Sequence, residues 1–100
     1  MFDSLDVAIT ATLRPALLEL TLWAFHRNFF SRLPGTHLRI LLNVDPLWGD
    51  PADAPRLVEI ARSYTDNVVV RAPEKPGFGE AVRWLWSNVA SDWVFHLEDD

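Results

Sequence analysis

The sequence WVFHLEDD, residues 93–100, is an apolar run that changes abruptly into three consecutive acids. An apolar run of this length predicts a buried β-strand, and the acids that follow it would lie at the rim of a sheet. Carboxylate oxygens are hard ligands, so a divalent cation that carries a phosphate could bind there. The same acids could also be solubilising charge or the N-cap of a following helix. The other strand ends of the chain favour the first of these two interpretations.

Upstream of this stretch, short apolar runs alternate with segments of helical periodicity. The runs predict strands near residues 6–12, 38–44, 67–71 and 93–97. The second run is almost continuously apolar, which is typical of a strand that is covered on both faces. Strands that alternate with helices imply right-handed crossovers and a parallel sheet. The predicted fold class is therefore α/β, a three-layer Rossmann-like parallel sheet with helices on both faces, in one domain of residues 1–100.

Proline, glycine and apolar spacing place three helices between these strands. Pro15 fits a first helical turn, and the apolar residues Leu18, Leu22, Phe25 and Phe29 follow it at intervals of four, three and four. Asp50 precedes Pro51 in the manner of an N-cap, and the third helix opens near Gly77. From these patterns we expect the following side chains to be buried: Leu22, Phe25, Ile40, Leu42, Val69, Trp86 and Phe95.

Composition excludes several classes of function. The chain has 100 residues, of which 49% are hydrophobic and 23% charged, so it is globular rather than disordered. Its formal net charge of −5, without a basic cluster, argues against a nucleic-acid partner. Because cysteine is absent, disulfides and thiolate sites are excluded. No apolar stretch reaches the roughly 18 residues of a membrane span, and residues 1–6 carry no basic segment, so we expect a cytoplasmic location.

Polar residues collect at the ends of the predicted strands, where a doubly wound sheet has its ligand crevice. Asp45 follows a buried strand and could accept hydrogen bonds from a nucleobase, or cap the turn before Pro46. Arg71 could face a diphosphate or be a solvated charge. Most of the five tryptophans are expected in the core, but Trp48 lies in a proline-rich loop and could flank a planar ligand. Together these strand ends favour a nucleotide site.

The order of these parts resembles the N-terminal, nucleotide-binding half of the glycosyltransferase-A fold, and in particular the family-two glycosyltransferases. In that family a first strand with a threonine-containing end precedes a long helix, and a second strand ends in aspartate. Here these two segments are ITAT (9–12) and NVD (43–45). A glycine-bearing helix start follows, matched by GFGEA (77–81). The last match is SDWVFHLEDD (91–100), which looks like the family's small residue, aspartate, aromatic residue, strand and DxD motif.

The resemblance implies a nucleotide-diphosphate sugar as the ligand and a divalent metal, Mn²⁺ or Mg²⁺, as the cofactor. It implies that the nucleoside is bordered by Thr10 and Thr12, and that the base meets Asp45. Glu98 and Asp100 would hold the metal, which neutralises the diphosphate and makes it a better leaving group. The full set of nucleotide-binding residues implied by the resemblance is Thr10, Thr12, Asp45, Arg71, Glu98 and Asp99. No catalytic base is identified.

Since the resemblance ends at the acidic motif, we expect the chain to be truncated relative to the family and inactive alone, with glycosyl transfer needing residues beyond 100. Further chain or a second copy would then cover the edges of the sheet. Two alternatives stay open. A nucleotidyltransferase of similar fold would carry a glycine-rich signature after its first strand, whereas residues 10–14 contain no glycine. A non-catalytic α/β module would use the same fold for assembly or protein binding.

Overall fold

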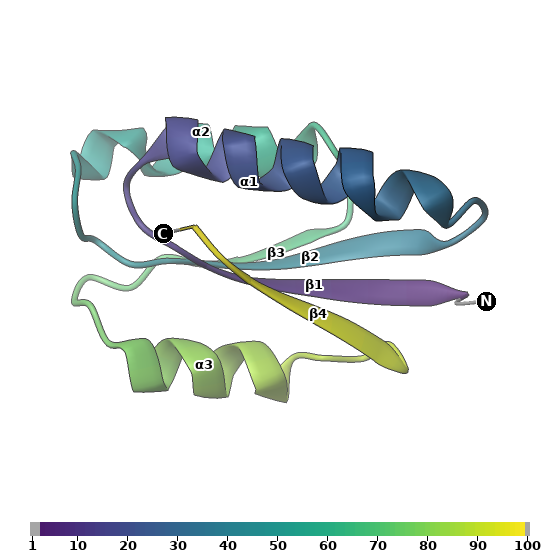
Figure 1. Cartoon of the computed structure of the whole chain (residues 1–100). Helices are drawn as coiled ribbons and strands as arrows, with labels where there is room; N and C mark the ends of the chain where they lie inside the picture. Colours follow the sequence, from purple (N-terminus) through teal and green to yellow (C-terminus); the bar gives the residue numbers. More distant parts are fainter. Residues whose placement is uncertain (1–2, 100) are drawn as a thin grey trace.

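The computed structural model describes residues 3–99 and contains one sheet of four parallel strands. Helices α1 (Pro15–Asn28) and α2 (Ala54–Arg62) cover one face of this sheet, and α3 (Phe78–Ser87) covers the other (Figure 1). The strands are β1 (Ser4–Ala11), β2 (His37–Val44), β3 (Val68–Arg71) and β4 (Trp93–Glu98). Two short 3-10 helices occupy Phe30–Arg32 and Pro51–Asp53. The predicted α/β fold with a parallel sheet is confirmed, and its layers fit a Rossmann-like layout.

The strand order is β3-β2-β1-β4, and each strand lies within two residues of its predicted position. Because all three pairings are parallel, the carboxyl ends of the strands meet at one edge of the sheet. The pairing register aligns one residue from each strand in a row near these carboxyl ends. Thr10 of β1 pairs with Asn43 of β2 and with Glu98 of β4, and Asn43 pairs in turn with Arg71 of β3. Polar residues that are far apart in the sequence therefore become neighbours.

The main core lies between the sheet and the pair α1 and α2. Alternate residues of the two central strands point to this side, since side chains of a strand alternate between the faces of a sheet. They pack against the apolar stripes of the two helices, and the fully buried members of this core include Val7, Ile9, Leu18, Ile40, Leu42 and Leu57. A smaller core beneath α3 contains Ala8, Leu41 and Leu85. The burial predicted for Leu22, Phe25, Ile40 and Leu42 is confirmed, and Val69 on the edge strand β3 is half-buried.

The prediction that Trp86 is buried is wrong, because α3 turns a different face to the sheet. Its buried residues are Ala81 and Leu85, and Leu85 packs beneath the central strands. Trp86 follows Leu85 by about 100° around the helix, which directs it away from this contact. Its side chain is 49% exposed and meets the ring of His96 edge-on at a centroid distance of 6.3 Å.

The burial predicted for Phe95 is also wrong, because β4 is an edge strand. The ring packs on α1 through Phe25 and on the adjacent Phe29, with centroid distances of 5.3 and 4.9 Å. Within residues 3–99 no strand pairs with the outer side of β4, so 37% of Phe95 stays exposed. A period-two apolar pattern cannot distinguish an edge strand from a central one.

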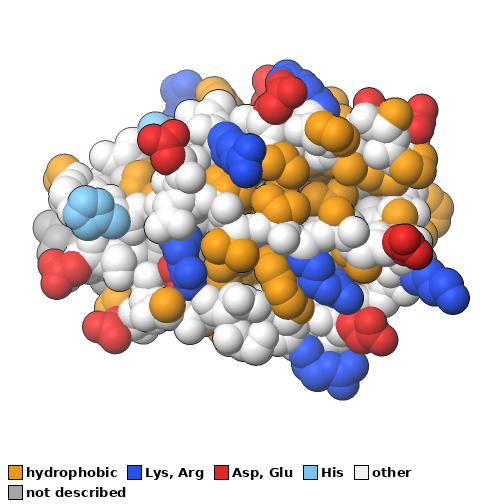
Figure 2. Space-filling model, turned by 180° about the vertical axis from the view of Figure 1, so that it is seen from behind, with side chains coloured by type: hydrophobic (Ala, Val, Ile, Leu, Met, Phe, Trp, Pro, Cys, Tyr) orange, Lys and Arg blue, Asp and Glu red, His pale blue; other side chains and the backbone are white. Residues whose placement is uncertain are grey.

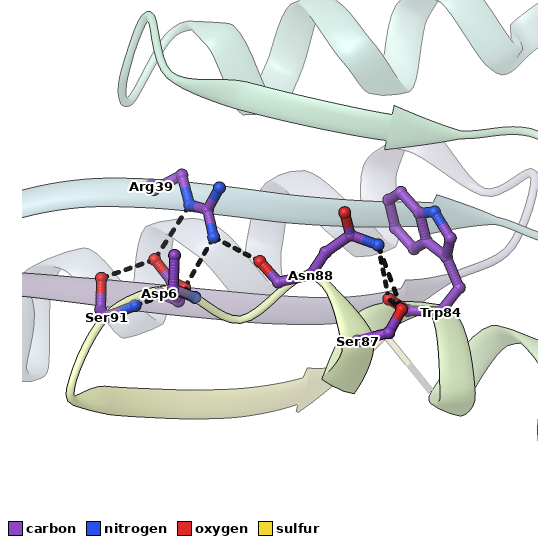
Figure 3. A network of polar contacts seen from close by, with 7 residues as sticks. Asp6, Arg39, Trp84, Ser87, Asn88 and Ser91 are labelled. Atoms are coloured by element: carbon purple, nitrogen blue, oxygen red, sulfur yellow. Dashed lines mark hydrogen bonds and ion pairs between the residues drawn. The ribbon is translucent and has the colours of Figure 1, made fainter.

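A buried ionic network joins β1, β2 and the loop that leads from α3 to β4 (Figure 3). The carboxylate of Asp6, which is fully buried, accepts two hydrogen bonds from the Arg39 guanidinium at 3.1 and 2.9 Å. It also accepts from the backbone N–H of Ala90 at 2.7 Å, and from the N–H and hydroxyl of Ser91 at 3.1 and 2.7 Å. Arg39 further donates to the carbonyl of Asn88. The network anchors the start of β4 beside β1.

Basic and acidic side chains are interspersed on the side of the molecule that Figure 2 shows, with hydrophobic side chains between them (Figure 2). The Lys and Arg side chains on this side therefore form no single basic patch. None of the helices in residues 3–99 has both the length and the apolar content that crossing a membrane requires.

Candidate functional site

A cavity of about 530 Å³ opens at the carboxyl edge of the sheet. Five of the residues that the sequence assigns to nucleotide binding line it, although they come from three separate parts of the chain: Thr10, Thr12, Asp45, Glu98 and Asp99. The loops at residues 47–48 and 76–78 complete its wall. This position is the ligand crevice of a parallel α/β sheet. The topology thus brings the predicted residues together where such folds bind ligands.

The ends of β1 and β4 are joined by direct hydrogen bonds between two of these residues. Thr12 donates to the Oδ2 atom of Asp99 from its backbone N–H at 2.9 Å and from its hydroxyl at 3.2 Å. Arg14 donates from Nε to the Thr12 hydroxyl at 2.9 Å and lies 4.0 Å from the other Asp99 oxygen. Asp99 is only 3% exposed. Its carboxylate is therefore oriented by the end of β1 before any ligand binds.

The Asp45 carboxylate is held by a neighbour that sequence reasoning missed. The side chain of Asn43 is fully buried, and its Nδ2 atom donates to Oδ1 of Asp45 at 2.9 Å. The amide orientation is set by Arg71, which donates to the Asn43 Oδ1 atom at 2.6 Å. The sequence signal for Asn43 is that it is a polar residue in an otherwise apolar strand. A buried amide requires hydrogen-bond partners, so such a residue indicates a polar contact. Asn43 thus fixes the position of the one carboxylate that β2 brings to the cavity.

Arg71 contacts neighbouring polar side chains and does not line the cavity. Its guanidinium contacts Asn43 and lies 3.6 Å from the carboxylate of Glu80 on α3. It is not among the residues that line the cavity. The contact predicted between Arg71 and a diphosphate stays a prediction, and the structure gives this residue a role in orienting Asn43.

Of the two predicted metal ligands, Glu98 lies at the end of β4 with an exposed side chain and lines the cavity. Asp100 lies outside the described residues. Within residues 3–99 no group of three His, Cys, Asp or Glu side chains is arranged to hold a metal ion. Among the described residues, the cavity lining carries three carboxylates, those of Asp45, Glu98 and Asp99, and no Lys or Arg, while Arg14, which is not part of the lining, lies 4.0 Å from Asp99. An anionic ligand in this cavity would therefore need a compensating positive charge.

The loop after β2, residues 45–49, is held against the end of β1 by backbone hydrogen bonds and close packing. Asp45 donates its backbone N–H to the carbonyl of Ala11 at 2.9 Å, and Leu13 donates to the carbonyl of Leu47 at 2.9 Å. Gly49 approaches the same segment so closely that a Cβ atom there would lie 1.8 Å from the carbonyl oxygen of Leu13. This loop therefore has a fixed position beside the cavity.

Replacement of Gly49 by alanine is expected to lower the free energy of unfolding by about 1–3 kcal/mol, because the added methyl group forces the loop away from β1. Chemical denaturation measures this loss. Gly79→Ala is the matched control, since a Cβ atom at Gly79 meets nothing within 4 Å and alanine favours the helix. Equal stability of the two variants would show that the loop does not depend on this close approach.

No family model matches the chain, and neither a curated protein nor a solved structure matches it. The functional assignment therefore rests on the resemblance of the motifs and on the cavity itself.

Proposed function

We propose that this chain is a glycosyltransferase-like domain, the N-terminal half of a glycosyltransferase-A-like fold, which binds a nucleotide-diphosphate sugar together with Mn²⁺ or Mg²⁺. The observation that carries this proposal is the shared cavity. Five of the six residues that the family resemblance assigns to nucleotide binding line one cavity at the carboxyl edge of the sheet. Three of them lie at or next to the ends of three different strands and are more than thirty positions apart in the sequence: Thr10, Asp45 and Glu98.

In this proposal the base and the nucleoside bind near the ends of β1 and β2. Asp45 is 7% exposed and lines the cavity, and its carboxylate can accept a hydrogen bond from a base N–H group. Thr10 and Thr12 border the nucleoside. The hydroxyl of Thr12 already contacts Asp99 and Arg14, so its contribution to a ligand is the shape of the wall rather than a new hydrogen bond.

The charge of the cavity supports a cation as part of the ligand. The described residues that line the cavity bring three carboxylates and no Lys or Arg, and the nearby Arg14 guanidinium lies beside only one of these carboxylates, that of Asp99. The lining would therefore repel a diphosphate, and a divalent ion reverses this balance. Glu98 and Asp100 would hold the ion, because the Asp99 carboxylate is bonded to Thr12. When bound, the ion would neutralise the diphosphate and stabilise it as the leaving group of glycosyl transfer. Glu98 supplies a hard oxygen ligand of the type that such ions prefer.

The outer side of β4 supports the second part of the proposal, that further chain or a second copy completes the protein. Exposed aromatic side chains lie on both faces of the sheet at this edge. Trp93 and Phe95 of β4 are 56% and 37% exposed, with Phe95 packed toward α1, and Trp86 of α3, on the opposite face, is 49% exposed. An edge strand with exposed aromatic residues is a typical pairing surface. A non-catalytic assembly module would use the same surface. A cytoplasmic location stays a prediction from the sequence.

Isothermal titration calorimetry with uridine or guanosine diphosphate tests the proposed function. One of these nucleotides is expected to bind more tightly with Mn²⁺ than with EDTA, and Glu98→Gln or Asp100→Ala should weaken the metal-dependent binding at least about tenfold. Glu59→Gln, which neutralises an exposed acid on α2, is the matched control. Identical binding in Mn²⁺ and in EDTA would contradict the metal site, and no binding of either nucleotide would contradict the proposal as a whole.

A further inference from the structure

We infer that Trp48 is a stacking platform for a planar heterocyclic base, so that the cavity selects ligands which carry such a ring over those which carry only a diphosphate. This inference rests on the proposed function, because it assigns the base end of the same cavity.

Trp48 has a φ angle of 63°, and it is the one residue other than glycine with positive φ in residues 3–99. A bulky side chain rarely adopts this left-handed conformation, because its Cβ atom crowds the following carbonyl. Strain of this kind persists only where the surrounding structure enforces it. Here the indole is 69% exposed. The strain at Trp48 is thus not offset by packing of the indole in the core, and backbone strain of this kind clusters at ligand sites.

The strained conformation is imposed by fixed neighbours on both sides. Asp45 and Leu47 are bonded to the end of β1 before it, and Gly49 packs on the backbone of Leu13 after it. The backbone at Trp48 therefore lies between two anchored points, and Trp48 is one of the residues that line the cavity. Because the backbone of this loop is already anchored, less conformational entropy is lost when a ligand stacks on Trp48.

The residues around the indole can contact both the hydrogen-bonding edge and the flat face of a nucleobase. Asp45, three residues earlier in the same loop, offers a carboxylate oxygen to an N–H group at the edge of the ring. Trp48 offers an aromatic face to the face of the ring. The first residue of α3, Phe78, adds a second aromatic side chain to the lining and is 59% exposed. Together these residues present hydrogen-bonding and stacking groups, which a bare diphosphate could not use.

The test measures binding of uridine diphosphate, guanosine diphosphate and inorganic pyrophosphate, each with Mn²⁺, to the whole chain. Trp48→Ala is expected to weaken binding of the nucleotides about 5- to 100-fold, the usual loss when an aromatic platform is removed from a base. Trp48→Phe should retain most of the affinity because it keeps an aromatic face. Binding of pyrophosphate should not change. Trp23→Ala removes an exposed tryptophan on α1 that does not line the cavity, and should bind every probe like the wild type.

Thermal melting separates a ligand platform from a structural residue. Trp48→Asn is expected to melt no lower than the wild type, because asparagine tolerates the left-handed conformation and little burial is lost. A clear fall in melting temperature, or wild-type nucleotide affinity in Trp48→Ala, would overturn the inference while leaving the proposed function intact. An equal loss for pyrophosphate would also overturn it, since it would indicate a distorted cavity. Failure of the wild type to bind either nucleotide would overturn both.

Discussion

Replacement of Asp6 by alanine is expected to lower the free energy of unfolding by about 3–5 kcal/mol at neutral pH. The Asp6 carboxylate is fully buried and accepts five hydrogen bonds. Its removal leaves the guanidinium of Arg39 without its carboxylate partner. It also leaves the backbone N–H groups of Ala90 and Ser91 without their acceptor. Urea denaturation followed by circular dichroism measures the loss.

Asp6→Asn tests the negative charge of Asp6 separately from the volume of its side chain. The asparagine has nearly the size of the aspartate, but its NH2 group replaces one of the two accepting oxygens and would face hydrogen-bond donors, so a large loss is again expected. Asp92→Asn, an exposed substitution one residue beyond Ser91, changes the net charge equally and should leave stability unchanged. A loss below 1 kcal/mol in Asp6→Ala would mean that water replaces the carboxylate, and that the network does not hold β4 in place.

The pH dependence of stability provides a second test of the Asp6 network. Burial, the largest single influence, raises the pKa of Asp6, but the hydrogen bonds from Arg39, Ala90 and Ser91 together outweigh it and hold the pKa far below the ordinary value of 3.8. A carboxyl group with a lowered pKa stabilises the fold above its ordinary pKa, and this contribution is lost as the pH falls. The difference in stability between wild type and Asp6→Asn should therefore be constant above about pH 5 and shrink below about pH 4.

The strands and the fold class could be predicted because their signals are local. The almost continuous apolar run of 38–44 predicts a strand that is covered on both faces, and β2 (His37–Val44) is central. Pro15 begins α1 as expected, and the carboxylate of Asp50 accepts from the N–H of Ala52 in the manner of a cap. Each of these signals depends only on neighbouring residues, and the packing of the folded chain agrees with the element that each signal predicts.

The exposure of side chains on the outer strand β4 could not be predicted in the same way, and neither could the Asp6 network. Both depend on residues that are distant in the sequence. Asp6 is one of two acids in the first six residues, and nothing near it in the sequence marks it as buried. Its partners Arg39 and Ala90 are 33 and 84 positions away. Likewise, the exposure of Phe95 follows from the place of β4 in the strand order, not from the pattern within the strand. A polar residue within an apolar run, such as Asn43, is the one local sign of such partners.

The candidate site was partly predictable, because strand ends can be found from the sequence while side-chain directions cannot. Thr10, Asp45 and Glu98 each come at or after the end of a predicted strand, and the parallel register brings them to one cavity. Arg71 also ends a strand, yet its guanidinium bonds to Asn43 and does not line the cavity. The strained backbone of Trp48 has no counterpart in the sequence pattern.

Asp45→Asn is expected to weaken binding of the nucleotide by about tenfold to a hundredfold while leaving stability nearly unchanged, since a hydrogen bond to a carboxylate contributes about 1.5–3 kcal/mol. Within residues 3–99, the amide of Asn43 is the one hydrogen-bond partner of this carboxylate. An asparagine at this position can still accept from Asn43 through its own oxygen. It would, however, present an N–H group instead of an oxygen to the base. Calorimetry measures the affinity and urea denaturation the stability.

Asp45→Ala is the informative companion, because it removes both contacts at once. Binding should fall as in Asp45→Asn, and stability should fall by about 1–3 kcal/mol because the buried amide of Asn43 loses its acceptor. The two effects therefore separate: loss of affinity in both variants, and loss of stability only in the alanine variant. If Asp45→Asn binds the nucleotide as tightly as the wild type while Asp45→Ala is unstable, Asp45 is a structural residue of the loop. The non-catalytic α/β module would then be the better assignment.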